Sequence, residues 1–344
     1  MKTLDSYWYE SSPLNRFVVV VLLPLSALYC LFGYLRRKLY SLNVIKSFRS
    51  DVPVIIVGNI VAGGSGKTPL LIALCEYARN RGLSPGVVSR GYGGRVDGLK
   101  QVVADDMAEL VGDEPLMIHR KIDVPVVVSA DRVSAVNHLL ENNGCDVVFS
   151  DDGLQHYRMM RDFEIAVVDT SRYFGNGFCL PAGPLREPVS RLNDVDLVIY
   201  NTGSDTTSES KVSESCSYSL RLSGISRLRD GEKASFSSFE QRTVHAVAGI
   251  GNPARFFNQL RQQGMNIIEH IFSDHHRYEQ GDFSGWASGC IVMTEKDAVK
   301  CHSLVLLDAW VVAAKVELSA KLESELDSRL LPVIDKKMRD EKET

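Results

Sequence analysis

The sequence predicts an α/β fold in which a mostly parallel β-sheet carries helices on both faces. Two observations predict this fold: short apolar runs alternate with amphipathic stretches, and a glycine-rich loop lies between an apolar run and a helical stretch. The runs end in small or charged residues and occupy 85–94, 124–132, 145–153, 163–171 and 195–203. Because ligands of parallel sheets bind at the carboxyl ends of the strands, the residues that end these runs are candidate site residues.

The glycine-rich loop reads "GNIVAGGSGKTP" from Gly58 to Pro69 and follows the apolar run 52–57. It predicts a phosphate-binding loop, in which backbone N–H groups surround a phosphate chain, a lysine reaches the outer phosphates and a hydroxyl binds Mg²⁺. The full pattern would place a glycine at Val61, so the match is partial, and a glycine-rich turn without a ligand is the alternative. The residues expected to bind phosphate or metal are Gly63, Gly64, Ser65, Gly66, Lys67 and Thr68.

Composition narrows the class of protein. A chain of 344 residues is typical of two domains, and 44% hydrophobic residues suffice to build a core. The formal net charge of -4 argues against a nucleic-acid-binding protein. Seven cysteines without a C-x-x-C pair predict reduced thiols in the cytosol and no zinc site.

The N-terminal region predicts a membrane helix. Phe17 to Leu35 carry no charge over nearly the length that crosses a bilayer, and Arg36, Arg37 and Lys38 follow directly. The positive-inside rule places this basic flank, and therefore the phosphate loop, on the cytoplasmic side. A buried core helix and a cleaved signal peptide are the alternatives, and Pro24 leaves open whether the helix spans the bilayer or lies in one leaflet.

We expect four regions along the chain. A polar, serine-rich stretch at 201–217 predicts an interdomain connection, and beyond it a helix at 252–264 and strands near 244–250, 289–297 and 309–315 predict a smaller α/β domain. The expected boundaries are 1–45 for the membrane-associated helix region, 46–205 for the nucleotide-binding domain, 206–330 for the smaller domain and 331–344 for a charged tail.

Two pairs of acidic residues are candidates for the chemistry. Asp151 and Asp152 follow an apolar strand, where phosphate-loop enzymes keep the carboxylate that holds magnesium. A helix cap is the alternative for that pair. Asp113 and Glu114 precede an apolar helical stretch, so capping and a functional role stand equal there.

Basic and neighbouring polar residues predict a second anionic ligand. Arg90 lies in the glycine-rich stretch 89–95, Arg132 ends another strand, and Arg186 and Glu187 lie in a loop flanked by prolines. Each arginine alone could form a surface ion pair. Gln155 and His156, which follow Asp151 and Asp152, are further candidates. His275 and His276 beside Asp274 are also candidates, and a structural turn is the alternative for these histidines.

The chain resembles the tetraacyldisaccharide 4'-kinase family, P-loop kinases of lipid A (lipopolysaccharide) biosynthesis, over nearly its whole length. The resemblance rests on ten stretches in the family's order: "VGN", "GGSGKTP", "SRGYGG", "GDEP", "SADR", "DDGLQH", "LPAGPLREP", "NPARFF", "SDHH" and "MTEKDAVKC". The family's loop likewise lacks the glycine at Val61. The resemblance therefore implies a P-loop NTPase-like α/β fold.

The resemblance also implies a reaction, the transfer of the γ-phosphate of ATP to the 4'-hydroxyl of an acylated glucosamine disaccharide 1-phosphate to give the bisphosphate lipid IVA. It implies that Asp113 accepts the hydroxyl proton, that His275 pairs with Asp113, and that Glu114 assists the magnesium. Thr68 with Asp151 or Asp152 would hold Mg²⁺. The weaker implied assignments, to nucleotide, metal or lipid phosphate, are Arg132, Gln155, His156, Arg186 and Glu187. The implied location is the bacterial inner membrane, with the site facing the cytoplasm.

Two other classes remain as alternatives. A P-loop GTPase or metal-insertion chaperone would carry N-K-x-D after a late strand, whereas this chain has Asn201 followed by Thr202. A membrane adaptor without kinase activity would bind nucleotide only as a structural ligand. Turnover of ATP with a lipid acceptor distinguishes the kinase from the adaptor.

Overall fold

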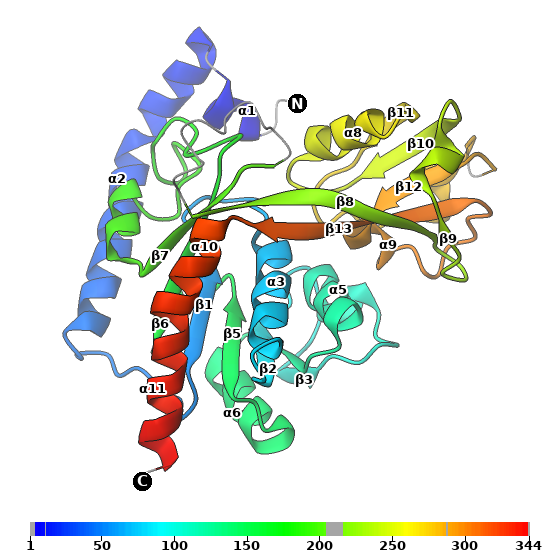
Figure 1. The fold of residues 1–344 in the computed structure, drawn as a ribbon. Helices are drawn as coiled ribbons and strands as arrows, with labels where there is room; N and C mark the ends of the chain where they lie inside the picture. Colours follow the sequence, from blue (N-terminus) through cyan, green and yellow to red (C-terminus); the bar gives the residue numbers. More distant parts are fainter. Residues whose placement is uncertain (1–3, 11, 204–215, 287, 343–344) are drawn as a thin grey trace.

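The computed structural model of the chain describes residues 4–10, 12–203, 216–286 and 288–342. A first unit contains the phosphate loop (Figure 1). The apolar runs predicted as strands are confirmed there. Its strands are β1 (Val54–Gly58), β2 (Pro85–Ser89), β3 (Leu99–Gln101), β4 (Val126–Ser129), β5 (Val147–Asp151), β6 (Phe163–Asp169) and β7 (Leu197–Asn201). Its helices are α3 (Lys67–Arg79), α4 (Ala108–Val111), α5 (Asp113–Ile122), α6 (Arg132–Asn143) and the 3₁₀ helix η1 (Val189–Asp194).

The sheet of the first unit is buried on both faces. Strand β1 is central, and it pairs in parallel with β5 on one side and β6 on the other. Its side chains alternate between two cores: Ile55 and Val57 pack with the residues of α3 and α5, while Val54 and Ile56 pack with those of α6. The predicted arrangement of helices on both faces of a mostly parallel sheet is therefore confirmed.

A second unit follows the first in the chain. Its strands are β8 (Ser217–Arg227), β9 (Lys233–Ala234), β10 (Thr243–Ala248), β11 (Asn266–Ile271), β12 (Ile291–Thr294) and β13 (Ala309–Leu318). Its helices are α8 (Pro253–Gln262), α9 (Glu295–Ala298) and the 3₁₀ helices η3 (Phe236–Phe239) and η4 (Gln280–Phe283). Most of the connection predicted at 201–217, residues 204–215, lies outside the described residues.

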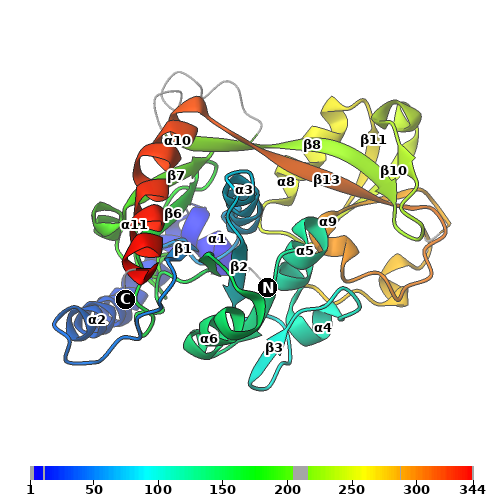
Figure 2. The same ribbon diagram turned by 60° about the horizontal axis from the view of Figure 1, so that its bottom comes forward.

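The two units share one 13-stranded sheet, in the order β11-β10-β12-β13-β8-β7-β6-β1-β5-β2-β4-β3, with β9 paired to β8. The long antiparallel pair β8 and β13 passes over α3 and joins the units, as Figure 2 shows. Strand β8 pairs with β7 in parallel at Ser217 and Tyr218. The segments that follow β1 in the first unit and β10 and β12 in the second line one common cavity.

The C-terminal segment returns to the first unit. It forms α10 (Ala320–Glu325), the π-helix η5 (Leu326–Leu330) and α11 (Leu331–Lys342) (Figure 1). Leu322, Leu326, Leu330 and Ile334 are buried in the core that also contains α3. We expected a charged surface helix with a loose tail in this region; within 331–342, Ile334 is buried and Leu331, Val333 and Met338 pack partly against the same core.

The N-terminal segment contains α1 (Leu4–Tyr9) and α2 (Pro13–Ser41). Helix α2 is long and apolar enough to cross a membrane, with a mean hydropathy of 2.3 in its most apolar window and 6% of that window buried. Within α2 only Asn15 and Ser26 are buried, so it is not a core helix. The Ser26 hydroxyl donates to the carbonyl oxygen of Cys179 at 2.6 Å, which attaches α2 to the loop that carries Arg186.

Candidate active site

The phosphate loop joins β1 to α3. Gly63 and Gly66 have φ angles of 103° and 84°, a left-handed conformation that favours glycine. The Lys67 ammonium lies 3.2 Å from the Asn59 Oδ1 that accepts its hydrogen bond and 3.4 Å from Asp152 Oδ1. Thr68 is buried in the first turn of α3, so the lysine and the hydroxyl lie where the phosphate-loop interpretation requires them.

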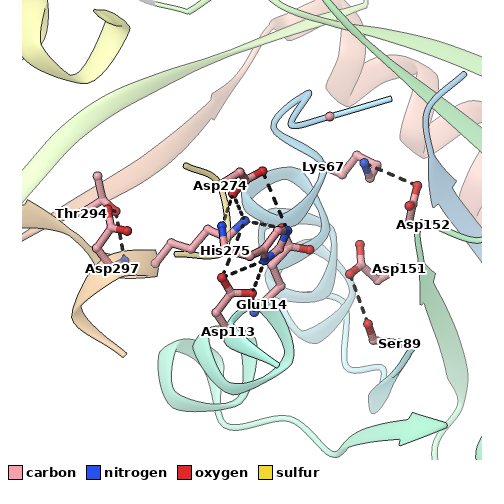
Figure 3. Close-up of polar contacts among 12 residues, drawn as sticks. Lys67, Ser89, Asp113, Glu114, Asp151, Asp152, Asp274, His275, Thr294 and Asp297 are labelled. Carbon is pink, nitrogen blue, oxygen red and sulfur yellow. Dashed lines mark hydrogen bonds and ion pairs between the residues drawn. The ribbon is translucent and has the colours of Figure 1, made fainter. Parts of the chain in front are cut away.

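Asp151 and Asp152 end β5 beside this lysine (Figure 3). Burial opposes ionisation of Asp152, but the charges of Lys67 and Arg186 outweigh it and hold the pKa of this carboxyl well below its usual range. Burial, with the charges of Glu114 and Asp152, instead raises the pKa of Asp151 to about 7. Among the described residues, the buried Oδ1 atoms of Asp151 and Asp152 have no hydrogen-bond partner, and Asp151 Oδ2 accepts a long bond of 3.4 Å from Ser89.

Asp113 and His275 meet across the two units. Asp113 begins α5 and is buried, and both of its carboxylate oxygens lie 3.0 Å from His275 Nδ1. Burial favours the neutral carboxyl, but the hydrogen bond with His275 and the charge of Lys296 outweigh it, so the pKa of Asp113 is lowered. Burial likewise opposes protonation of His275, yet the bond to Asp113 raises the pKa of its imidazole. The pair is 162 residues apart in sequence.

The sequence reasoning missed Lys296, which enters the same cluster from α9. Its ammonium lies 2.8 Å from Glu114 Oε1, 2.9 Å from Asp274 Oδ1 and 3.9 Å from Asp113 Oδ2. Burial lowers the pKa of Lys296, but these three carboxylates outweigh it and raise it. Lys296 lies just after the end of β12, and Asp151 was chosen as a candidate because it lies at the end of a strand. The same criterion would have identified Lys296.

Two of the predicted arginines bind the aspartates at the end of β5. Arg186 Nη1 lies 2.7 Å from Asp152 Oδ2. Arg132 is buried, and its guanidinium donates to the backbone carbonyls of Asp151 and Asp152 at 2.8 and 3.0 Å. Arg132 therefore uses these hydrogen bonds on backbone carbonyl groups, and they fix the positions of the two aspartates. Arg90 is exposed in the loop after β2.

The remaining predicted residues lie next to this cluster. Gln155 donates to Glu187 Oε2 at 2.8 Å, and Tyr157 donates to the other oxygen of Glu187. Burial lowers the pKa of His156 to about 4, and its buried Nε2 has no hydrogen-bond partner in the part of the chain that the structure describes. His276 lies apart from the pair at Asp113 and lies 2.9 Å from Asp282.

The oxygens beside the loop fit a magnesium ion. Among the residues that the structure describes, no group of three or more His, Cys, Asp or Glu could hold a metal alone. Mg²⁺ is typically bound through one or two carboxylates together with substrate phosphates, so such a group is not required. The unpartnered Asp151 oxygen and the Thr68 hydroxyl are hard donors of this kind.

A cavity of about 400 Å³ adjoins the loop beneath β8 and β13. Its polar lining includes the phosphate loop, Glu114 and Lys296. Its apolar lining includes Ile72, Met117, Leu220, Leu222, Phe256 and Val312. A lining that combines charged and apolar side chains fits a ligand that carries both charged groups and a less polar part.

The fold and the site define a P-loop kinase, in which a phosphate loop, strand-end aspartates and a carboxylate–histidine pair converge between two units. The family model for tetraacyldisaccharide-1-P 4'-kinase (LpxK) matches residues 18–331. The chain belongs to this family of lipid A 4'-kinases and is a transferase.

Individual relatives agree with the family assignment. A tetraacyldisaccharide 4'-kinase of Coxiella burnetii is 47% identical over 86% of this chain and 85% of its own length. One from Shewanella halifaxensis is 45% identical over 98% of both chains. The solved structure of "apo" form LpxK from Aquifex aeolicus in complex with ATP is similar with a TM-score of 0.75 and 27% identity, over 92% of this chain and 99% of that one.

Proposed function

We propose that this chain transfers the γ-phosphate of ATP to the 4'-hydroxyl of tetraacyldisaccharide 1-phosphate and so forms the 1,4'-bisphosphate, lipid IVA. The observation that carries the proposal is the Asp113–His275 pair, which the second unit completes beside the phosphate loop. A sugar hydroxyl is a weak nucleophile, and a positioned carboxylate that accepts its proton in the transition state is the usual remedy.

Asp113 is suited to accept that proton. Its lowered pKa keeps it ionised at neutral pH, and His275 holds the carboxylate through Nδ1. Tyr92 packs edge-on against the His275 ring, with ring centroids 4.9 Å apart, and limits the rotation of the imidazole. We infer that the hydroxyl proton passes to a carboxylate oxygen of Asp113 as the 4'-oxygen attacks the γ-phosphorus, while the bond from the γ-phosphorus to the β–γ bridging oxygen breaks and ADP leaves.

The loop and the strand-end acids position the phosphates. The N–H groups of residues 63–66 and the Lys67 ammonium would surround them, as in other phosphate loops. When bound, Mg²⁺ neutralises charge on the phosphates. Thr68 with Asp151 or Asp152 would hold it: the Oδ1 atom of each aspartate is buried without a hydrogen-bond partner among the described residues, and Asp152 also forms ion pairs with Lys67 and Arg186. Glu114, which is close enough to raise the pKa of Asp151, would assist.

The nucleoside of ATP would occupy the cavity next to the loop, where Ile72, Leu220 and Phe256 offer apolar contact. The lipid phosphate would approach from the side of Arg186 and Arg90. Arg186 belongs to the loop that holds α2, so this placement puts the lipid site next to the membrane helix.

We propose that α2 anchors the enzyme at the bacterial inner membrane, with the site facing the cytoplasm. Its exposed face includes Val20 and Leu25, and basic residues follow at its C-terminal end. The double variant Val20→Glu/Leu25→Glu should sediment less with phospholipid vesicles than the wild type. Val305→Glu, at an exposed apolar residue of the second unit, is the control and should sediment normally.

The kinase is tested with γ-labelled ATP and purified tetraacyldisaccharide 1-phosphate in mixed micelles. Wild type should label the lipid, Lys67→Ala should lose ATP binding and transfer, and Asp113→Asn should keep ATP binding but lose about 10²–10⁴-fold in kcat. The exposed Asp230→Asn serves as the control and should match wild type. No labelled lipid from a wild-type protein that binds ATP would refute the proposed acceptor.

A further inference from the structure

The turn between β10 and α8 lies directly against the phosphate loop. A Cβ atom added to Gly251 would lie 2.9 Å from the Cα of Gly64 and 3.0 Å from its nitrogen. A Cβ added to Gly64 would in turn lie 3.2 Å from the Cα of Gly251. The two backbones are therefore in contact, and no side chain fits between the second unit and the loop.

Arg255, in the first turn of α8, reaches across the same boundary. Its Nη2 lies 3.0 Å from Asp169 Oδ1 at the end of β6, and its Nη1 lies 3.1 Å from Asn201 Oδ1 at the end of β7. The Arg255 side chain is 16% exposed, and the Asp169 side chain 7%. A bridge this well buried holds its geometry better than a surface ion pair does.

Asn201 connects this bridge to the loop. Its amide Nδ2 donates to the Ser65 carbonyl at 3.1 Å, and its Oδ1 accepts from the Gly203 N–H at 3.2 Å as well as from Arg255. The two donors on Oδ1 fix which end of the amide faces the loop. A Cβ on Gly66 would lie 2.3 Å from Asn201 Nδ2, so the loop packs closely on this side chain.

We propose that Arg255 and Gly251 are positioning residues of the second unit that hold the phosphate loop in its binding conformation. Arg255 acts through the Asn201 amide on the Ser65 carbonyl, and Gly251 acts by direct contact with Gly64. Asn201 is the residue that matched the first position of the guanine-binding N-K-x-D motif. Here its amide holds the phosphate loop instead. ATP affinity, a property of the first unit's loop, therefore depends on contacts that the second unit supplies.

The inference rests on the proposed function, because it concerns the ATP that the loop binds. A loop held in one conformation loses less conformational entropy when ATP binds. Conversely, ATP bound to the loop must stabilise the contact between the units by the same free energy, because the coupling of two sites is reciprocal.

The test measures the Kd for ATP by calorimetry on the full chain in detergent. Arg255→Met removes both charged hydrogen bonds while keeping an unbranched, largely apolar stem, and should weaken ATP binding about tenfold or more. Gly251→Ala should weaken it as well. Gly281→Ala is the matched control in the same unit, because a Cβ there meets nothing within 4 Å, and it should bind ATP as wild type does.

A double-mutant cycle separates this role from a general loss of stability. If Arg255 acts through Asn201, then Asn201→Ala/Arg255→Met should bind ATP no more weakly than Asn201→Ala alone. Additive losses in the cycle, or wild-type affinity in both Arg255→Met and Gly251→Ala, would overturn the inference. Failure of the proposed function would show differently, as a wild-type chain that binds no ATP or labels no lipid.

Discussion

Lys296→Met tests whether the lysine from the second unit sets the ionisation of Asp113, the carboxylate that we propose as the proton acceptor. The substitution removes a cation 3.9 Å from Asp113 Oδ2 and leaves a side chain of similar length. Two unit charges about 4 Å apart interact by roughly 4 kcal/mol at an effective dielectric constant of about 20. Since one pKa unit corresponds to about 1.4 kcal/mol, that interaction alone would shift the pKa of Asp113 by up to about 3 units.

The expected shift is smaller because other cations remain. His275 keeps its hydrogen bond, and Lys300 still lies 3.9 Å from Asp113 Oδ2. We therefore expect the pKa of Asp113 to rise, but by less than the loss of the Lys296 charge alone would give. Asp113 must be ionised to accept the hydroxyl proton, so a higher pKa means that activity is lost at a higher pH as the solution is acidified.

The assay is the pH profile of kcat/KM for the lipid acceptor at saturating Mg²⁺. In Lys296→Met the acidic limb of the profile should move to higher pH, and Lys296→Arg should move it back. Lys337→Met is the matched control, because the Lys337 side chain is also 13% exposed and binds Asp162 at 2.8 Å, far from the site. A uniform loss of activity with an unmoved acidic limb would refute the reasoning.

Two further predictions concern stability and the histidine. Leu326→Ala should lower the free energy of unfolding by about 2–5 kcal/mol in urea denaturation, because this side chain is fully buried. Ser328→Ala, at an exposed residue, is the control. A loss in Leu326→Ala no larger than that in Ser328→Ala would contradict the packing of the C-terminal helix. Asp113→Asn should lower the pKa of His275, because burial then opposes protonation without the charged acceptor that now raises it. An NMR titration of the imidazole measures this, and an unchanged pKa would mean that the Asp113 contact does not hold in solution.

The local sequence was sufficient to predict much of the site. The strands that precede Asp151 and Asn201, the loop that ends in Lys67 and Thr68, and the α2 helix all follow from short-range signals: apolar runs, glycines and periodicity. These signals are reliable because the pattern of buried residues in a strand or a helix repeats every two to four residues, so a short stretch of sequence is enough to show it. The family resemblance added the Asp113–His275 pair, which no local pattern contains.

Only the tertiary structure decided which strand-end residues meet. Lys296 reaches Glu114 from 182 residues away, and Arg255 reaches Asn201 from 54 residues away. Burial also turned Arg132 inward onto backbone carbonyls and folded Leu326 into the core of the first unit. The contacts of Lys296 and Arg255 depend on how β8 and β13 place one unit over the other, and residue type and spacing along the chain do not encode that geometry.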